Sequence, residues 1–245
     1  MQQGRLQGLR HVSSMVVRFA REVPGVAQKA ADRLVQSGSV ESCLIVSPPG
    51  RGKTTFLRDL IRCVSERGWR VSVADERREL AAGKNGVPQL DLGPCTDVLS
   101  GCPKAQAIPL LLRVMNPQGL AFDELAGRTE LDMAREAACC GTAVFATAHG
   151  NGIGSLLARP GYGALLEVFS WCVTLQTFDT YRMERLGDYA KDYGSLLCGG
   201  GVADERLGRK TGDEPAAWPA AAAAAGPGAY AGGDGAAHAH RGRAV

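Results

Sequence analysis

Nine consecutive residues carry the strongest pattern in this sequence: Ser47-Pro48-Pro49-Gly50-Arg51-Gly52-Lys53-Thr54-Thr55. They follow a short apolar run at 43–46, typical of a buried parallel strand, and precede a helical pattern that ends at Gly68. This order of strand, glycine-rich turn and helix predicts a Walker A phosphate loop, in which backbone N–H groups and a helix N-terminus surround a phosphate. Ser47 replaces the motif's first glycine, and serine is tolerated at the end of a strand if its φ is negative.

The rest of the motif is intact, so we expect all nine residues to take part in nucleotide binding. Lys53 is expected to reach the β- and γ-phosphates as a mobile cation. The Thr54 hydroxyl is expected to be a ligand of Mg²⁺. Gly50 and Gly52 let the backbone curl so that its N–H groups point inward. The alternative is a loop that has lost nucleotide binding, and the intact Lys53 argues against it.

A second acidic pattern follows later in the chain. The apolar run at 119–122 ends in Asp123 and Glu124, which gives it the form of a Walker B strand. We expect Asp123 to hold the Mg²⁺ shell and Glu124 to polarise the attacking water as general base. The adjacent glutamate favours ATP hydrolysis over a P-loop GTPase or a small-molecule kinase, so the expected cofactors are ATP and Mg²⁺.

The next predicted strand also ends in polar residues. Thr147 and His149 follow the apolar run at 142–146, in a strand that we expect beside the Walker B strand. A polar residue at this place can sense the γ-phosphate or orient water, and His149 is therefore a candidate catalytic residue. The alternative is a histidine with only a structural role.

Strand and helix patterns alternate through the middle of the chain. Apolar runs predict strands at 43–46, 70–74, 119–122, 142–146, 168–176 and 181–186, of which the last two form a C-terminal pair. Helical patterns lie at 56–64, 103–115 and 130–140, while residues 83–101 indicate a long loop. Alternation of this kind predicts an α/β fold with a mostly parallel sheet between layers of helices.

Composition divides the chain into three parts. Residues 1–39 form a basic segment, because six of the chain's 28 Lys and Arg residues but only two of its 25 acidic residues lie within the first 40. We expect this segment either to be solvated or to act as an arm that contacts a neighbouring subunit or an acidic surface. Residues 40–198 are the expected P-loop ATPase domain, and 199–245 are a linker with a Gly/Ala-rich disordered tail.

The overall composition excludes several classes of protein. Hydrophobic residues make up 45% of the chain, too many for a disordered protein, and no apolar run reaches the 18 residues that suggest a membrane-spanning helix. The N-terminus lacks the apolar core of a secretory signal. The formal net charge of +3 is too small to argue for a nucleic-acid partner. The eight cysteines contain no C-x-x-C pair and indicate reduced, cytosolic thiols.

Further motifs resemble known families. The run Leu111-Leu112-Arg113-x-x-x-Pro117, the strand end Asp123-Glu124 and the segment 141–150 resemble type II and type IV secretion ATPases. The chain is more similar to the stage III sporulation protein AA family, in segments 8–14, 20–22, 75–79, 86–89 and 96–105. The resemblance runs from about residue 8 to residue 198. The family has a further N-terminal region, which we expect this chain to lack.

The resemblance implies a RecA-like ATPase core that self-associates into a hexameric ring. Phosphoryl transfer needs positive charge beyond Lys53, which arginines of a neighbouring subunit can supply. Arg113 matches the arginine ahead of the Walker B strand in secretion ATPases, and Arg77 and Arg128 are further candidates. For each, the alternative is an arginine at the surface or one that supports the fold.

The role that the resemblance implies is to power or assemble a membrane channel between mother cell and forespore during endospore formation. The protein is then expected in the mother-cell cytoplasm, held at the membrane by channel proteins of the sporulation apparatus. One alternative is a nucleic-acid translocase, although no basic stripe or aromatic platform stands out beyond residue 40. The other, suggested by Ser47, is a nucleotide-dependent scaffold that does not hydrolyse ATP.

Overall fold

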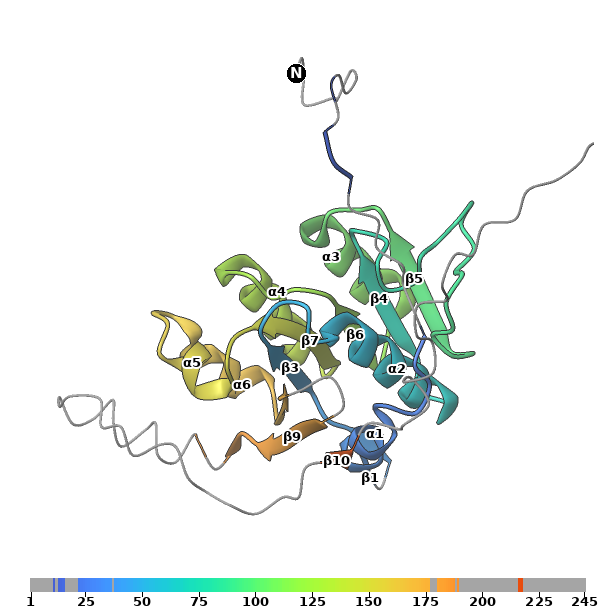
Figure 1. The fold of residues 1–245 in the computed structure, drawn as a ribbon. Helices are drawn as coiled ribbons and strands as arrows, with labels where there is room; N and C mark the ends of the chain where they lie inside the picture. Colours follow the sequence, from blue (N-terminus) through green and yellow to red (C-terminus); the bar gives the residue numbers. More distant parts are fainter. Residues whose placement is uncertain are drawn as a thin grey trace, which may run out of the picture.

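The computed structural model describes residues 11, 13–15, 22–36, 38–176, 180–187, 189 and 216–217. Most of the chain before residue 22, and nearly all of the expected linker and tail at 199–245, lie outside the described residues. Figure 1 shows a central sheet with helices on both of its faces.

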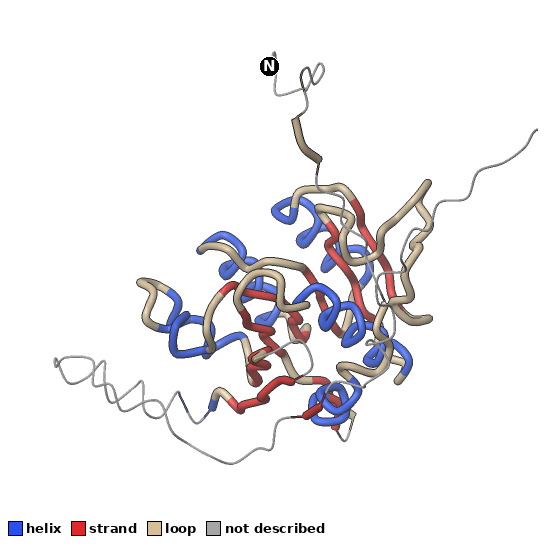
Figure 2. The backbone as a smooth tube through the Cα atoms, viewed as in Figure 1, coloured by secondary structure: helices blue, strands red, loops and turns tan. Residues whose placement is uncertain are grey.

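An eight-stranded sheet forms the centre of the fold (Figure 2). Its strands are β3 (Cys43–Ser47), β4 (Val71–Asp75), β5 (Thr96–Ser100), β6 (Gly119–Phe122), β7 (Ala143–His149), β8 (Trp171–Leu175), β9 (Thr180–Arg185) and β10 (Ala216–Ala217). They lie in the order β10-β9-β8-β3-β7-β6-β4-β5. The strands from β8 to β5 are parallel, and β9 and β10 extend the sheet as antiparallel strands. The carboxyl ends of β3, β4, β6 and β7 therefore meet at one edge, where ligands bind in open α/β sheets.

Helices cover both faces of this sheet and account for its burial. They are α1 (Gln28–Leu34), α2 (Lys53–Glu66), α3 (Lys104–Met115), α4 (Arg128–Cys139), α5 (Ile153–Leu157), the 3₁₀ turn η1 (Tyr162–Ala164) and α6 (Leu165–Val168). Ile45 of β3 belongs to one buried cluster together with Phe56 of α2. Its neighbour Leu44 belongs to the other cluster, together with Ile108 of α3. Because every residue of β3 is buried between helices, its sequence is a continuous apolar run. The predicted α/β class, with a C-terminal strand pair, is confirmed.

The expectation of a continuous loop at 83–101 is wrong for its last part. Residues Thr96–Ser100 form β5, which within the described part of the chain pairs with β4 alone. As an edge strand, β5 stays partly exposed, and its threonine, aspartate and serine interrupt any apolar run. Periodicity therefore gave no strand signal there.

The packed core begins earlier than the expected boundary at residue 40. Ala27, Ala30, Ala31 and Leu34 are fully buried against α2, in a stretch that the sequence assigns to the basic segment 1–39. The buried carboxylate of Asp59 accepts the backbone N–H groups of Gly25 and Ala27 at 3.1 and 2.8 Å. Residues 35–36 (β1) and 39–40 (β2) form a small hairpin that joins α1 to β3. Because the buried face of α1 consists mostly of small alanines and charged residues lie beside it, the sequence shows no strong hydrophobic pattern there.

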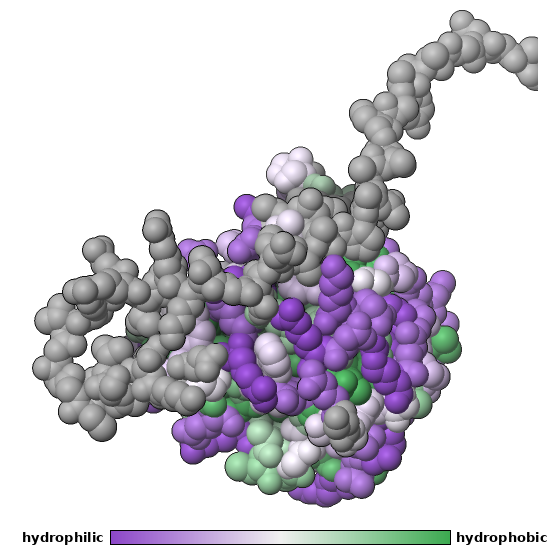
Figure 3. Space-filling view, turned by 90° about the horizontal axis from the view of Figure 1, so that it is seen from below, coloured by the Kyte–Doolittle hydropathy of each residue, from purple (hydrophilic) through white to green (hydrophobic). Residues whose placement is uncertain are grey.

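Three features of the described residues bear on the compositional expectations: membrane-spanning helices, the polarity of the surface and the cysteines. Among the described residues, no helix has both the length and the apolarity that are needed to cross a membrane. The face in Figure 3 is mostly hydrophilic, with apolar residues in scattered areas. The described cysteines are free thiols. Burial raises the pKa of Cys63 to about 11 and that of Cys172 to about 12, so both stay protonated and unreactive near neutral pH.

Candidate active site

The loop Ser47–Thr55, here called the glycine loop, connects β3 to α2 at the carboxyl edge of the sheet. Gly50 has a φ of 75° and Gly52, the N-cap of α2, has a φ of 88°. A residue with a Cβ would be strained at both positions. Among the described residues, no side chain caps the start of α2. The loop therefore turns backbone N–H groups and the positive end of a helix dipole toward the space in front of it, as anion-binding loops do.

The remaining residues of the glycine loop lie between the end of β3 and the first turn of α2. Ser47 is buried at the end of β3, with the expected negative φ, and its Oγ donates to the carbonyl of Pro48 at 2.9 Å. Pro49 and Arg51 lie at the exposed top of the loop, and Thr55 is half-buried in the first turn of α2. The serine in place of the first glycine thus fits without backbone strain.

Lys53 is buried at the base of the loop and connects it to β7. Its Nζ donates to the carbonyls of Ser47 and Pro48 at 3.0 and 3.1 Å, and lies 3.0 Å from Nδ1 of His149. Because an ammonium group only donates, Nδ1 accepts and the ring proton resides on Nε2. Burial lowers the pKa of Lys53, while Asp123 and Glu124 oppose that shift. The Lys53 amino group is thus held at the base of the loop by two loop carbonyls and by His149.

Thr54 and Asp123 bring two oxygen donors together from separate elements. The Thr54 hydroxyl, in the first turn of α2, donates to Oδ2 of Asp123 at 2.8 Å. Asp123 follows β6, and its Oδ1 accepts a hydrogen bond from the hydroxyl of Thr147 on β7. Hydroxyl and carboxylate oxygens are the ligands that Mg²⁺ prefers, usually completed by phosphate oxygens and water. The residues present therefore fit the predicted magnesium site.

Glu124 has an unusual backbone conformation and three polar or charged neighbours. Its φ is 60°, in the left-handed region that residues other than glycine seldom adopt. Its N–H donates to the Thr147 hydroxyl at 2.9 Å. Its carboxylate lies 2.7 Å from Nη1 of Arg77 and 4.0 Å from Nε2 of His149. The predicted general base is thus brought together with Arg77 and His149 in one chain.

The position of Arg77 depends on residues that the sequence did not single out as site residues. Asp75, which is buried at the end of β4, accepts the backbone N–H groups of Glu79, Leu80 and Ala81 at 2.9–3.2 Å. Arg58 of α2 donates to the carbonyls of the same turn at 2.6 and 2.7 Å. The start of the loop after β4, which carries Arg77, is thereby held against β4 and α2. An apolar strand that ends in an acid, as at 71–75, is the signal that could have pointed to Asp75.

Lys104 is another residue of this region that sequence reasoning missed. Its Nζ donates to the backbone carbonyls of Asp123 and Glu124 at 3.2 and 2.7 Å. It lines a small hollow together with Arg77 and Glu124. The segment 96–105 drew attention only as part of the family resemblance, which gave Lys104 no role.

The other two candidate arginines are not brought to the glycine loop of their own chain. Arg113 is exposed in the last turn of α3, roughly 13 Å along the helix axis from Lys104 at its start. Arg128 is also exposed, and its guanidinium lies against Gly161, where an added Cβ would come within 2.8 Å of Nε. Of the three arginines, Arg77 alone is placed at the predicted general base.

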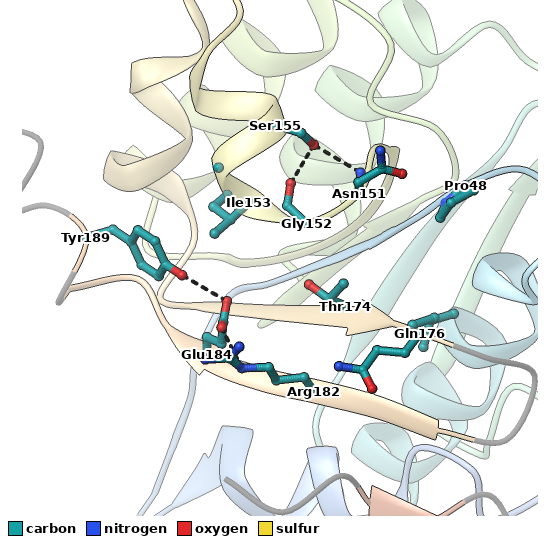
Figure 4. A pocket seen from close by; sticks show the side chains of 12 residues that line it. Pro48, Asn151, Gly152, Ile153, Ser155, Thr174, Gln176, Arg182, Glu184 and Tyr189 are labelled. Atoms are coloured by element: carbon teal, nitrogen blue, oxygen red, sulfur yellow. Dashed lines mark hydrogen bonds and ion pairs between the residues drawn. The ribbon is translucent and has the colours of Figure 1, made fainter. Parts of the chain in front are cut away.

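A larger cavity of about 400 Å³ borders the glycine loop at Pro48 (Figure 4). Polar groups from the loop after β7 and from the β8–β9 pair line it. Their contacts are Ser155 Oγ with the N–H of Asn151 (3.0 Å) and the carbonyl of Gly152 (2.7 Å), Arg182 with Glu184 (2.7 Å), and Tyr189 with Glu184 (3.2 Å). Lys53, Asp123 and Glu124 are not among its lining residues. The cavity is therefore adjacent to the candidate site rather than part of it.

Comparison with known sequences connects this chain to a sporulation family. The family described as Sporulation stage III, protein AA matches residues 1–180. The chain is 36% identical over 170 residues to stage III sporulation protein AA of Bacillus subtilis (strain 168), covering 67% of this chain and 55% of that protein. It is 30% identical over 158 residues to the uncharacterized protein ycf45 of Porphyra purpurea, covering 63% and 27%. The chain thus spans about half the length of its Bacillus relative.

Solved structures with a similar fold are ATPases of secretion and pilus systems. The ATPase DotB of Legionella pneumophila gives a TM-score of 0.51 at 18% identity, covering 70% of this chain and 51% of that one. The pilus retraction motor PilT with bound ADP gives 0.50 at 14% identity, covering 75% and 61%. At these identities the likeness shows the fold, which is the RecA-like fold of such ATPases. By its sequence match over residues 1–180, the chain belongs to the stage III sporulation protein AA family.

Proposed function

We propose that this chain is a P-loop ATPase, with the glycine loop as its Walker A motif and Asp123-Glu124 as its Walker B motif. The observation that carries the proposal is the contact between Thr54 and Asp123, whose oxygens meet at 2.8 Å from two different elements. Lys53 on one side and Glu124 on the other complete the set of groups that phosphoryl transfer needs. These are the residues that the two sequence motifs predict for each role.

ATP with Mg²⁺ is the ligand that this donor set fits best. Thr54 and Asp123 would hold the metal, which when bound supplies positive charge to the phosphoryl oxygens. Lys53 would exchange the two carbonyls that it now contacts for phosphate oxygens. Backbone N–H groups around Gly50 and Gly52 would bind the remaining phosphate oxygens.

Glu124 and its neighbours are proposed to take the proton of the attacking water and to stabilise the charge that develops on the phosphoryl group. Its carboxylate takes a proton from the attacking water as general base. Arg77, now paired with that carboxylate, supplies positive charge to the transferred phosphoryl group in the same chain. His149 contacts Lys53 through one ring nitrogen and faces Glu124 with the other, so it couples phosphate binding to the base.

The wider role that we propose is to power or assemble a membrane channel during endospore formation. Family membership supports the sporulation context, and the fold shared with secretion and pilus ATPases supports a motor. On this proposal the protein forms a hexameric ring in the mother-cell cytoplasm and reaches the membrane through channel proteins. Arg113, which is exposed and remote from its own glycine loop, is the candidate to act on a neighbouring subunit.

Binding and turnover of ATP by the purified chain test the proposal. Titration with a fluorescent ATP analogue measures binding, and release of inorganic phosphate measures turnover, each with Mg²⁺ and with excess EDTA. Turnover is measured over a range of protein concentrations, because ring formation depends on concentration. Magnesium-dependent phosphate release supports the proposal. Tight binding without release at any concentration would instead favour a nucleotide-dependent scaffold.

A further inference from the structure

The turn at Asp123-Glu124 is held in a conformation that the sequence alone does not favour. Glu124 adopts a φ of 60°, whereas glutamate, unlike glycine or asparagine, has little preference for the left-handed region. Surrounding groups must therefore impose this geometry. The N–H of Glu124 is held on one side by Thr147 Oγ1 at 2.9 Å and by Asp123 Oδ1 at 3.0 Å.

Lys104 holds the other side of the same turn. Its Nζ donates to the carbonyl of Glu124 at 2.7 Å and to that of Asp123 at 3.2 Å, and Oε1 of Glu130 lies 3.9 Å away. Only 13% of the Lys104 side chain is exposed. The ammonium group is thus directed at backbone carbonyls on two consecutive residues, which fixes the direction in which the Glu124 side chain leaves the chain.

The place of Lys104 in α3 is a second, independent observation. Lys104 is the first residue of that helix, next to the positive end of the helix dipole, where acidic side chains are favoured and lysine is not. The first turn of α3 contains no acidic residue. The positive charge of Lys104 is unfavourable at the N-terminus of its own helix, and yet the side chain is nearly buried. Such a combination is typical of a functional position rather than of one selected for stability.

We infer that Lys104 is a positioning residue for the general base, and this inference rests on the proposed ATPase function. Its ammonium group clamps the carbonyls of residues 123 and 124, and thereby points the Glu124 carboxylate toward Arg77, His149 and the front of the glycine loop. It does so without touching the nucleotide, because its hydrogen bonds are directed at the backbone. Lys104 therefore contributes to turnover and not to ATP affinity.

The test compares Lys104→Met with Lys104→Arg and with Lys84→Met. Methionine keeps the length of the side chain and removes its charge, arginine restores donors, and Lys84 is an exposed lysine on the loop after β4. We expect Lys104→Met to lower kcat by about tenfold or more, with KM and ATP affinity within about twofold of wild type. Lys104→Arg should recover part of the loss, and Lys84→Met should match wild type. An unchanged kcat in a folded Lys104→Met protein overturns the inference.

A double variant shows whether Lys104 acts through Glu124. If it does, adding Lys104→Met to Glu124→Gln causes no further loss, because the base that Lys104 positions is already gone. If the decreases in kcat from the two substitutions multiply in the double variant, Lys104 acts on the phosphate directly, which contradicts a positioning role. Glu130→Gln is a second control, since it removes the weaker contact of Lys104 and leaves both carbonyl contacts in place.

Hydrogen exchange gives a readout that does not depend on hydrolysis. The N–H groups of Glu124 and Leu125 are both hydrogen-bonded to Thr147. In Lys104→Met we expect exchange in a peptide spanning 119–127 to be about tenfold faster, with the glycine loop unchanged. Unchanged protection at this turn overturns the inference even if the protein hydrolyses ATP. A different result would separate the two proposals. If the wild-type chain does not hydrolyse ATP but exchange at this turn is faster in Lys104→Met, the proposed function is overturned, while the role of Lys104 in holding the carbonyls of residues 123 and 124 is supported.

Discussion

Within one chain, Nη1 of Arg77 lies 2.7 Å from Oε2 of Glu124. The sequence suggested Arg77 as an arginine donated by a neighbouring subunit, and the structure places it beside the proposed general base of its own chain. The arginine is 67% exposed and the carboxylate 28%, so the pair is open to solvent and the carboxylate can exchange partners when phosphate enters.

Arg77→Ala is expected to lower ATP turnover at least tenfold, with ATP affinity within about twofold of wild type. The variant loses a positive charge that would face the transferred phosphoryl group but keeps the glycine loop. Phosphate release under saturating ATP measures the effect. A rise in turnover would instead mean that the ion pair restrains Glu124.

Mixed assemblies distinguish action within a chain from action between chains. If Arg77 serves its own site, a mixture of Arg77→Ala and Glu124→Gln chains stays inactive, because every chain carries a damaged site. If Arg77 serves a neighbour, some sites in the mixture combine an intact Glu124 with a donated Arg77. Recovered phosphate release on mixing would therefore contradict the assignment.

Lys53→Ala is expected to weaken ATP binding by about 100-fold or more, because a buried charge-assisted contact with phosphate is lost. Titration with a fluorescent ATP analogue measures the change. Lys84→Ala is the control, since Lys84 is an exposed lysine outside the glycine loop. Equal affinity of the Lys53 variant and wild type would exclude the glycine loop as the phosphate site.

Asp123→Asn is expected to abolish the gain in ATP affinity that Mg²⁺ gives the wild-type chain. The carboxylate that contacts Thr54 is replaced by a neutral amide, a much poorer Mg²⁺ ligand. Affinities measured with Mg²⁺ and with EDTA should then be nearly equal. Asp132→Asn, at an exposed position on α4, should keep the difference. A full magnesium effect in Asp123→Asn would place the metal elsewhere.

Asp75→Asn is expected to destabilise the fold by roughly 2–3 kcal/mol, because an amide offers one acceptor oxygen to three backbone N–H groups, two of them buried. The melting temperature should fall by roughly 5–10 °C. Asp97→Asn, at an exposed position on edge strand β5, is the control and should melt like wild type. No difference between the two variants would show that the loop carrying Arg77 is not held by Asp75.

Short-range patterns were sufficient to predict six of the eight strands of the sheet, the glycine-rich motif and the acidic motif. The apolar run of β3, the glycines after it and Asp123-Glu124 after β6 are each visible within a few residues of sequence. Parallel order then brings Thr54, Asp123 and Thr147 to one edge, because the carboxyl ends of neighbouring strands meet there.

The contacts that complete the site depend on pairings distant in sequence. Lys104 reaches carbonyls 19 and 20 residues away, and Arg58 reaches carbonyls 21 and 22 residues away. Such long-range contacts produce no periodic pattern in the sequence from which they could be predicted. Arg113 matches a family pattern, yet α3 carries it to the edge of the sheet opposite the glycine loop, so any role at an ATP site requires a second subunit. The short helix α1 was missed because its buried face consists mainly of small alanines, and the edge strand β5 because polar residues interrupt its apolar run.

The most direct test of the ATPase assignment separates binding from turnover at Glu124. Glu124→Gln keeps the size and the hydrogen-bonding capacity of the side chain but cannot accept a proton from water. We predict that this variant binds ATP with Mg²⁺ as tightly as wild type. Its rate of phosphate release should be lower than that of wild type by at least about 100-fold. Phosphate release by Glu124→Gln at the wild-type rate would contradict the account.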